Sequence, residues 1–319
     1  MYMKILITGV AGFIGHSIAA DLLSKKHYVY GLDNLDNYYS IKIKKKRLNN
    51  LNKYNKFFFK KIDLNNKKNL ENYFKRKKFD LVVHLAAQAG VRYSFENPEK
   101  YINSNFFGFL NLVLCSRDNN VKKIIYASSS SIYGDSKKLP VSEKDKLSTK
   151  NIYAVTKKLN EDTAELYSKL TNIKFVGLRF FTIFGEWGRP DMLIFKVFKS
   201  HFTNKKIYIN NYGHHYRDFT YIGDVTKIIK KLIFKKLSKH DIFNICSNNP
   251  ININELIKNF SKNYKLNKQF VKLHKADVIN THGNNNKIKK QLNLNSFTNF
   301  YKAFYKTFEW YKKNKIYKI

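Results

Sequence analysis

The sequence places Tyr153 and Lys157 four residues apart, in a stretch whose apolar spacing predicts a helix from about Tyr153 to Leu170. Residues at positions i and i+4 lie on one face of a helix, so the phenol and the ammonium would be neighbours. A tyrosine ordinarily has a pKa of about 10, and holding it as a phenolate at neutral pH needs a shift of roughly 3 units, about 4 kcal/mol. A nearby positive charge favours that shift. The pair therefore predicts a general base that removes a hydroxyl proton.

Four consecutive serines, Ser128 to Ser131, stand at the end of an apolar stretch that predicts a strand. A serine hydroxyl beside the phenolate can orient a substrate hydroxyl and relay its proton. Tyr-x-x-x-Lys is a weak motif on its own, because a chain with 22 Tyr and abundant Lys contains accidental matches. The serine-rich strand end and the glycine turn near the start of the chain favour catalysis over chance.

That glycine turn carries Gly9, Gly12 and Gly15, after a short apolar stretch and before an apolar helical pattern. A strand, a glycine turn and a helix in this order let a pyrophosphate approach bare backbone amides at the positive end of the helix dipole. A second predicted strand ends on Asp33, 18 residues after Gly15. A carboxylate there accepts hydrogen bonds from an adenosine ribose and repels a 2′-phosphate, so the pattern favours NAD over NADP.

The elements that must position these residues alternate between strand-like and helical stretches up to about residue 180. This alternation predicts an α/β fold with a doubly wound, parallel, Rossmann-type sheet and ligands at the carboxyl ends of its strands. Strands are expected at 5–8, 28–32, 57–59, 79–86, 123–128 and 175–180, and a further helix at 101–115. Shorter strands are expected at 207–210, 242–246 and 270–273, with a terminal helix at 299–313. We expect an NAD-binding domain over 1–185, to which about 219–246 returns, and a smaller C-terminal α/β substrate domain over 186–319.

Composition restricts the class of protein and its partners. No stretch of the 319 residues approaches the roughly 20 apolar residues of a membrane span, so no membrane partner is expected. The net charge is +37, but the lysines are spread over predicted loops and outer helix faces without a nucleic-acid-binding motif. We attribute the excess to compositional bias and expect no nucleic-acid partner.

The cysteines, the histidines and the first residues favour a reducing, metal-free setting. Two cysteines, Cys115 and Cys246, form no disulfide framework, which makes the cytoplasm the simplest location. Residues 1–15 belong to the nucleotide-binding unit, so we expect no signal peptide. The pair His214-His215 has no partners at ligand spacing and predicts a solvated loop, so no metal site is expected.

Together these motifs resemble the extended short-chain dehydrogenase/reductases of the NAD-dependent epimerase/dehydratase family, and within that family the UDP-glucuronate 4-epimerases. The resemblance extends from Lys4 to about Val225 and more weakly to Lys287. It rests on the stretches LITGVAGFIG at 6–15, DNL at 33–35, DL at 63–64, HLAAQAGVRYS at 84–94, ASSSSIYG at 127–134, YAVTK at 153–157, LRFFT at 178–182, GRPDM at 188–192 and RDFTY at 217–221. Gly223-Asp224 departs from the two aspartates usual there, and Asp277-Val278 and Thr281 are the anchors between 263 and 286.

The resemblance implies a role for each matching residue. Tyr153 would be the catalytic base, Lys157 would hold the nicotinamide ribose and tune the tyrosine, and Ser129 would bridge to the sugar 4-hydroxyl. The cofactor NAD would be bound by Gly9, Gly12, Phe13, Ile14, Gly15, Asp33, Asn34, Asp63, Leu64, Ala86, Ala87, Tyr153, Lys157 and Phe180. The substrate would be bound by Gln88, Arg92, Ser129, Ser130, Ser131, Tyr153, Thr182, Arg189, Arg217 and Asp277. Among these, Ser130, Ser131 and Thr182 would lie near the sugar carboxylate, and Arg189 and Arg217 toward the diphosphate.

The implied function is 4-epimerisation of a UDP-sugar through a 4-keto intermediate, between UDP-glucuronate and UDP-galacturonate. A UDP-glucose or UDP-N-acetylglucosamine 4-epimerase is the open alternative. Dehydratases usually carry Thr-Asp-Glu in the serine stretch, and decarboxylases often carry a glutamate before its Tyr-Gly. The absence of a carboxylate from Ser129 to Ile132 disfavours both. A non-catalytic NAD-binding protein would lack Tyr153 or Lys157. Family analogy also implies a homodimer formed through helices near 105–115 and 153–170.

Overall fold

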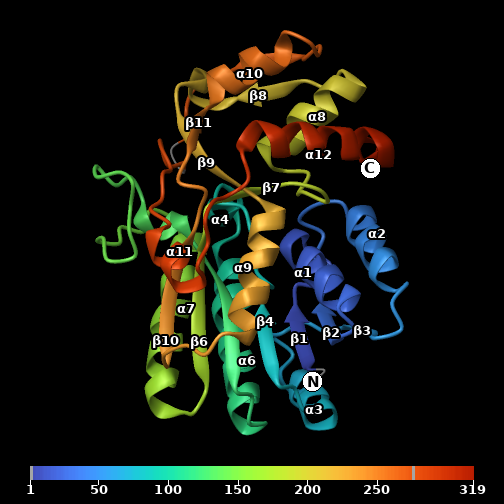
Figure 1. The fold of residues 1–319 in the computed structure, drawn as a ribbon, viewed down its shortest axis with the longest axis vertical. Helices are drawn as coiled ribbons and strands as arrows, with labels where there is room; N and C mark the ends of the chain where they lie inside the picture. The colour runs from blue at the N-terminus through green and yellow to red at the C-terminus, as the bar shows by residue number, and fades with distance from the viewer. Residues whose placement is uncertain (1–2, 275–276) are drawn as a thin grey trace.

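The computed structural model describes residues 3–274 and 277–319, and its largest element is a seven-stranded sheet in the order β10-β6-β5-β4-β1-β2-β3 (Figure 1). Every neighbouring pair in this sheet is parallel. The strands are β1 (Lys4–Thr8), β2 (Tyr28–Asp33), β3 (Phe57–Lys61), β4 (Leu81–His84), β5 (Lys123–Ser129), β6 (Lys174–Phe180) and β10 (His240–Ile245). The strand order reverses between β1 and β4, where doubly wound sheets bind their ligands. The predicted Rossmann-type α/β fold is confirmed.

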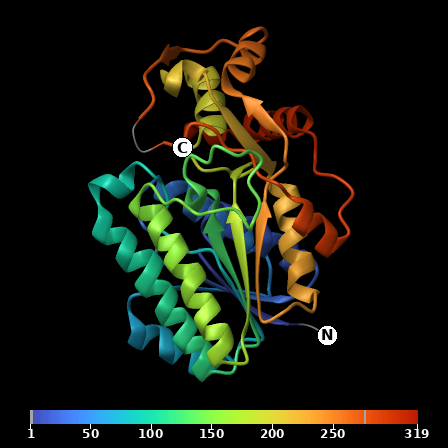
Figure 2. The same ribbon diagram turned by 90° about the vertical axis from the view of Figure 1, so that its left-hand side faces the viewer.

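Helices cover both faces of this sheet because side chains alternate along its strands. Ile5 and Ile7 of β1 pack with α1 (Phe13–Ser24) and α9 (Ile222–Phe234), whereas Leu6 packs with α3 (Lys67–Lys77) and α6 (Gly108–Asp118). The remaining flanking helices are α2 (Ile41–Leu51), α7 (Ile152–Leu170) and α11 (Asn286–Leu292). Figure 2 shows α6 and α7 side by side on one face of the sheet.

The helix expected at 101–115 is interrupted. Two short helices, α4 (Tyr93–Glu96) and α5 (Pro98–Tyr101), lead into a π-helical segment, Ile102–Phe107, and only then into α6. Asn105, inside the π-helical segment, accepts a hydrogen bond from the Gln88 amide (2.7 Å) and donates to the Gln88 carbonyl (3.1 Å) and to Thr156 Oγ1 (3.1 Å). Single π-helical turns frequently occur at functional sites. This one ties the loop after β4 to α7.

A smaller layer lies beyond the carboxyl ends of the main sheet, at the top of Figure 1. Its strands form a three-stranded sheet of β7 (Thr182–Phe184), β9 (Tyr216–Tyr221) and β11 (Pro250–Asn252), and a parallel pair of β8 (Ile207–Ile209) and β12 (Lys268–Phe270). Its helices are α8 (Leu193–Thr203), α10 (Ile253–Ser261) and α12 (Phe300–Asn314). Short 3₁₀ turns occur at Ser130–Tyr133, Asn210–Gly213 and Ile316–Lys318. This layer has its own aromatic core, which includes Phe198, Phe260, Phe304 and Phe308.

The segment 219–246, predicted to return to the main sheet, is divided between the two layers. Strand β10 pairs with β6, and α9 packs on α1, so both lie with the main sheet. Residues 219–221 instead belong to β9 and pair with β7 and β11. The physical reason is the buried Asp218, whose carboxylate accepts hydrogen bonds from the amides of Ser247, Asn248 and Gly283 and so holds β9 in the smaller layer.

The structure tests the expectations about the cysteines, the histidine pair, metal sites and membrane-spanning helices. Cys115 and Cys246 are buried and unpaired. His214 is exposed, but His215 is buried, at 6% exposure, which corrects the expectation of a solvated loop for the second histidine. Within residues 3–274 and 277–319, no group of three or more His, Cys, Asp or Glu side chains is placed to hold a metal ion. No helix in those ranges is both long enough and apolar enough to cross a membrane.

Candidate active site

One cavity of about 630 Å³ lies between the carboxyl ends of the main sheet and the smaller layer. Every residue that the sequence singles out for cofactor, substrate or catalysis lines it: Gly9, Gly12, Phe13, Ile14, Gly15, Asp33, Asn34, Asp63, Leu64, Ala86, Ala87, Gln88, Arg92, Ser129, Ser130, Ser131, Tyr153, Lys157, Phe180, Thr182, Arg189, Arg217 and Asp277. The fold thus brings together residues that lie up to 268 positions apart, from Gly9 to Asp277. Their individual roles are still predictions.

The glycine turn has no room for side chains. Gly9 has φ +71°, and a Cβ there would lie 2.7 Å from the Ala86 amide nitrogen. A Cβ on Gly15 would lie 2.2 Å from the Gly9 carbonyl oxygen. Helix α1 starts immediately after Gly12 with no acidic residue in its first turn, so its free amides present a positive end to the cavity. This geometry fits a dinucleotide pyrophosphate.

Asp33 ends β2 with its carboxylate beside the turn. Its Oδ2 accepts a hydrogen bond from the Ala11 amide (3.1 Å) and its Oδ1 from the Leu35 amide (2.8 Å). Burial raises the pKa of Asp33, and the positive charge of Lys44 and the two amide donors oppose that rise. Each carboxylate oxygen keeps a second lone pair. Asp33 can therefore accept further hydrogen bonds from the two hydroxyls of a ribose.

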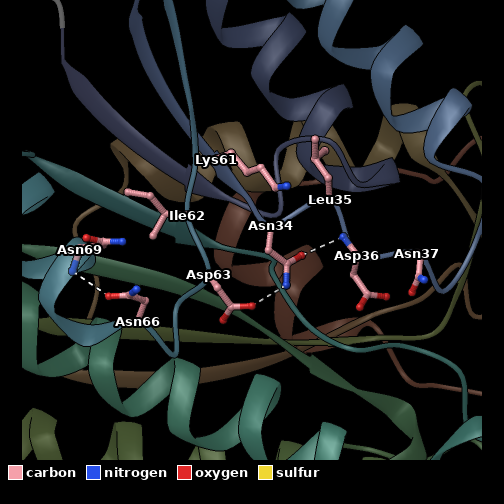
Figure 3. Close-up of a pocket in the computed structure, with 9 residues that line it drawn as sticks. All are labelled: Asn34, Leu35, Asp36, Asn37, Lys61, Ile62, Asp63, Asn66 and Asn69. Carbon is pink, nitrogen blue, oxygen red and sulfur yellow. Dashed lines mark hydrogen bonds between the residues drawn. The ribbon is translucent and has the colours of Figure 1, made fainter.

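A polar pocket of about 570 Å³ opens beyond Asp33, toward the outer end of the cavity (Figure 3). Asn34 Nδ2 donates to Asp63 Oδ2 (2.9 Å), while Asn34 Oδ1 accepts from the Asp36 amide (3.0 Å). Asp63 Oδ1 accepts from the Asn65 amide (2.9 Å). Figure 3 shows Ile62 beside this hydrogen-bonded rim. An apolar side chain next to fixed amide and carboxylate groups suits the ring and the amino edge of a nucleobase.

Tyr153 and Lys157 lie on α7, as predicted, with Lys157 Nζ 5.8 Å from the centre of the Tyr153 ring. The Asn151 side chain caps the helix by accepting a hydrogen bond from the Ala154 amide (2.9 Å). Lys157 is 1% exposed, and its ammonium donates to the Ala127 carbonyl at the end of β5 (3.0 Å). Among the described residues this carbonyl is its one hydrogen-bond acceptor, although an ammonium carries three donors. The remaining donors fit the hydroxyls of a second ribose.

Burial has the largest effect on the titration of Tyr153 in the protein without a ligand. Burial raises the pKa of Tyr153, opposed by a hydrogen bond with the Ser129 hydroxyl and by the positive charge of Arg189. Burial also lowers the pKa of Lys157 to about 8. A positively charged ligand bound beside the ring would lower the pKa of Tyr153 further.

The buried Lys157 makes the stability of the cofactor-free protein depend on pH in a defined direction. Its folded-state pKa is below the ordinary 10.5, so from pH 8 to 10.5 the unfolded chain binds more protons than the folded chain. The free energy of unfolding, relative to that of a Lys157→Met variant, is expected to rise by up to about 3 kcal/mol across this window. Urea denaturation of both proteins from pH 7 to 10.5 measures the difference. A difference that stays flat or falls would contradict the assigned burial.

A buried polar network lies directly behind the serine stretch. Ser129 Oγ donates to Ser131 Oγ (3.1 Å), and the Ser128 hydroxyl donates to Glu161 Oε1 (2.6 Å). Glu161 forms a bidentate ion pair with Arg179 (3.0 and 2.8 Å), and both side chains are 4% exposed. Arg179 also donates to the Tyr133 hydroxyl (2.8 Å). The network therefore fixes both ends of the serine-rich turn against α7 and β6.

Three arginines lie toward the smaller layer. Arg189 forms a bidentate pair with Asp191 (3.0 and 2.5 Å). Arg217 donates to the carbonyls of Val278 (2.8 Å) and Ile279 (2.6 Å), and burial lowers its pKa to about 10. Arg92 and Asp277, each expected to contact substrate, bind each other (3.2 and 2.6 Å). That pair joins the loop after β4 to the segment that carries Val278.

Several cavity residues escape the sequence reasoning: Tyr38, Lys44, Ser104, Lys196 and His215. Tyr38 and Lys44 follow Asp33 closely along the chain, and that proximity to a predicted ligand residue was the available signal. Lys196 and His215 come from the smaller layer, where no spacing pattern points to the cavity. Burial lowers the pKa of both, that of His215 to about 4.

Comparison with known proteins adds independent observations. A family model described as the NAD dependent epimerase/dehydratase family matches residues 5–246. The UDP-glucuronate 4-epimerase of Thermodesulfobacterium geofontis is 38% identical over 313 residues, covering 97% of this chain and 96% of that protein. Protein CapI of Staphylococcus aureus is 39% identical, with 97% and 98% covered. The structure resembles that of the Bacillus cereus UDP-glucuronic acid 4-epimerase in complex with UDP-glucuronic acid and NAD, with a TM-score of 0.90, 27% identity, and 98% and 100% coverage.

Proposed function

The chain belongs to the NAD-dependent epimerase/dehydratase family, and we propose that it interconverts UDP-glucuronate and UDP-galacturonate. The protein is an isomerase, a nucleotide-sugar 4-epimerase, and NAD is its cofactor. The choice of a uronic acid as the sugar is our proposal. It is supported by relatives that carry this activity in their names, over nearly the whole length of this chain.

The observation that carries the sugar assignment is the set of neutral hydroxyl donors that line the same cavity as Tyr153. Ser130, Ser131 and Thr182 line the cavity at the ends of β5 and β6, and no carboxylate interrupts the serine stretch. Hydroxyl donors bind a sugar carboxylate through charge-assisted hydrogen bonds without adding a titrating group. An aspartate or glutamate at this place would repel that carboxylate and would supply acid chemistry that epimerisation does not need.

The chain holds the reactants and moves one proton. Bound NAD would supply a reversible acceptor for the hydride of carbon 4, so the net redox change of the reaction would be zero. The glycine turn and Asp33 would hold the dinucleotide at one end, and Lys157 would hold its nicotinamide ribose. Tyr153 would take the 4-hydroxyl proton while Ser129 orients that hydroxyl, and it would later return the proton. Arg189 and Arg217 would hold the diphosphate, so that the hexose turns about this fixed point and presents its other face.

Replacing Thr182 with Val is expected to lower kcat/KM for UDP-glucuronate about tenfold and to change that for UDP-glucose less than about twofold, because a hydrogen bond to a charged group contributes about 1.5–3 kcal/mol. Steady-state rates with both sugars measure the difference. Thr226→Val on α9, whose hydroxyl donates within its own helix, is the matched control and should leave both rates unchanged. A wild-type preference for UDP-glucose, or equal losses with both sugars, would contradict the uronate assignment.

We also propose that the protein works as a cytoplasmic homodimer formed through α6 and α7. Phe107, directly before α6, is 48% exposed, and Leu166 and Leu170 of α7 are 53% and 68% exposed. Phe107 lies at the amino end of α6, and the two leucines lie at the carboxyl end of α7. Exposed apolar side chains on two adjacent helices suit an isologous interface. Sedimentation velocity would show twice the 37.8 kDa chain mass, and a monomer at micromolar concentration would contradict the dimer.

A further inference from the structure

Arg47 of α2 is fully buried, and its guanidinium is bound by oxygens that carry no charge. One terminal nitrogen donates to the Ala11 carbonyl (3.0 Å) and to the Tyr39 hydroxyl (2.9 Å). The other donates to the carbonyls of Trp187 (2.5 Å) and Gly188 (3.2 Å). Among the described residues no carboxylate lies within ion-pair distance of it, although its positive charge helps to oppose the rise that burial causes in the pKa of the nearby Asp33 carboxyl. A buried cation normally requires a compensating negative charge, so this one needs a physical explanation.

The two sides of this guanidinium lie against two different ligand-binding segments. Ala11 belongs to the glycine turn, and its peptide is held from both directions: its amide donates to Asp33, and its carbonyl accepts from Arg47. Trp187 and Gly188 immediately precede Arg189, which the proposed function places on the diphosphate of the substrate. A continuous series of hydrogen bonds therefore links the carboxylate of Asp33, which is predicted to bind a ribose, to the backbone of the two residues that precede Arg189.

Arg189 is also restrained through Asp191 by Tyr38, a residue close to Arg47 in the sequence. Its partner Asp191 accepts a hydrogen bond from the Tyr38 hydroxyl (3.4 Å), and Tyr38 precedes Arg47 by nine residues. Trp187 has φ +62°, a left-handed conformation that a bulky residue adopts only when its surroundings hold it there. The hydrogen bond from Arg47 to the Trp187 carbonyl supplies one such restraint.

We propose that Arg47 is a positioning residue that couples the cofactor site to the substrate site. A dinucleotide bound at the glycine turn would fix the Ala11 peptide, whose carbonyl accepts a hydrogen bond from Arg47. Arg47 then holds the 187–188 backbone so that Arg189 faces the diphosphate. This inference rests on the proposed binding of a UDP-sugar at Arg189, and it concerns the nucleotide part alone, whichever hexose is attached.

Coupling between two sites is reciprocal in binding free energy, so UDP should tighten the binding of NAD by the same factor as NAD tightens the binding of UDP. We expect the more tightly bound NAD to leave the protein more slowly. The test uses the protein as purified with NAD and follows the release of NAD into buffer, with and without saturating UDP. In the wild type we expect UDP to slow release about tenfold, within the usual range of such couplings. In Arg47→Met we expect the effect of UDP to fall below about threefold, although each ligand still binds. If Arg47→Met does not fold, Arg47→Lys keeps the charge, loses the forked reach and carries the same expectation.

Leu48→Ala is the matched control. Leu48 is the next residue of α2, and its apolar side chain packs in the core and cannot form the hydrogen bonds to residues 187–188 that Arg47 forms. It should lower the melting temperature and keep the wild-type effect of UDP on NAD release. The coupling role is overturned if Arg47→Met keeps that effect, or if Leu48→Ala loses it to the same extent. A wild type that binds UDP without slowing NAD release overturns it as well. If UDP does not bind to the wild type at all, the proposed function itself is wrong.

Discussion

Tyr153→Phe is expected to lower kcat for 4-epimerisation by about three orders of magnitude while leaving bound NAD and UDP affinity unchanged. The substitution removes one oxygen from a buried ring on α7 and leaves its packing in place. Positioned acid–base groups typically contribute about 10²- to 10⁴-fold to a rate, and the proposed mechanism assigns the transfer of the 4-hydroxyl proton to Tyr153. The measurement is product formation under saturating UDP-glucuronate, with NAD content determined on the same preparation.

Tyr126→Phe is the matched control for this variant. Tyr126 is a fully buried tyrosine of β5 whose hydroxyl is hydrogen-bonded to His240 Nε2 (3.0 Å), outside the cavity. Losing that hydroxyl should cost stability and leave kcat within about twofold, because catalysis does not use it. Full turnover by Tyr153→Phe would remove the tyrosine from its role as the base. An equal loss in both variants would assign the effect to the packing of the protein.

Glu161→Gln is expected to lower the free energy of unfolding by about 3–5 kcal/mol, since it leaves Arg179 charged and buried without its partner. The new amide also directs an N–H donor at either the guanidinium or the Ser128 hydroxyl, both of which donate to the native carboxylate. Urea denaturation at pH 7 measures the change. We expect kcat to fall as well, because the network positions the serine turn beside Tyr153.

Glu165→Gln provides the comparison on the same helix, one turn away. Glu165 pairs with Lys169, and these side chains are 54% and 68% exposed, so solvent screens their attraction. Such exposed pairs contribute about 0–1 kcal/mol, and the substitution should change stability by no more than that. Similar losses for the two variants would contradict the distinction between a buried ion pair and an exposed one.

Local patterns in the sequence were sufficient to predict the central sheet, the glycine turn and the Tyr153–Lys157 pair, whereas most of the other cavity residues were implied by the family resemblance. Gly9, Gly12 and Gly15 predict the turn because only a bare backbone fits against the Gly9 carbonyl and the Ala86 amide. Tyr153 and Lys157 predict their own proximity because helix geometry fixes it. In both cases the signal in the sequence is local, a three-residue spacing in the turn and a four-residue spacing on the helix, although Ala86 comes from the distant loop after β4.

The features that escaped prediction depend on contacts between distant segments. The π-helical segment at 102–107 is held by hydrogen bonds to the Gln88 backbone. The spacing of apolar residues in the sequence does not distinguish a π-helical turn from an α-helical one. Arg47 follows three lysines, a pattern that predicts a solvent-exposed helix face. In the structure it is buried and donates hydrogen bonds to carbonyls 36 and 141 residues away. Arg92 and Asp277 were predicted separately, but their mutual ion pair across the cavity requires three-dimensional information.

The most direct test of the proposed activity is proton NMR of the purified protein with UDP-glucuronate and a trace of NAD, alongside a parallel sample containing UDP-glucose. We predict that UDP-galacturonate accumulates to equilibrium without net NADH, and that UDP-glucose is converted much more slowly. Conversion of UDP-glucose alone would contradict the uronate assignment while leaving Tyr153 as the base. Release of carbon dioxide from UDP-glucuronate would contradict the epimerase mechanism itself.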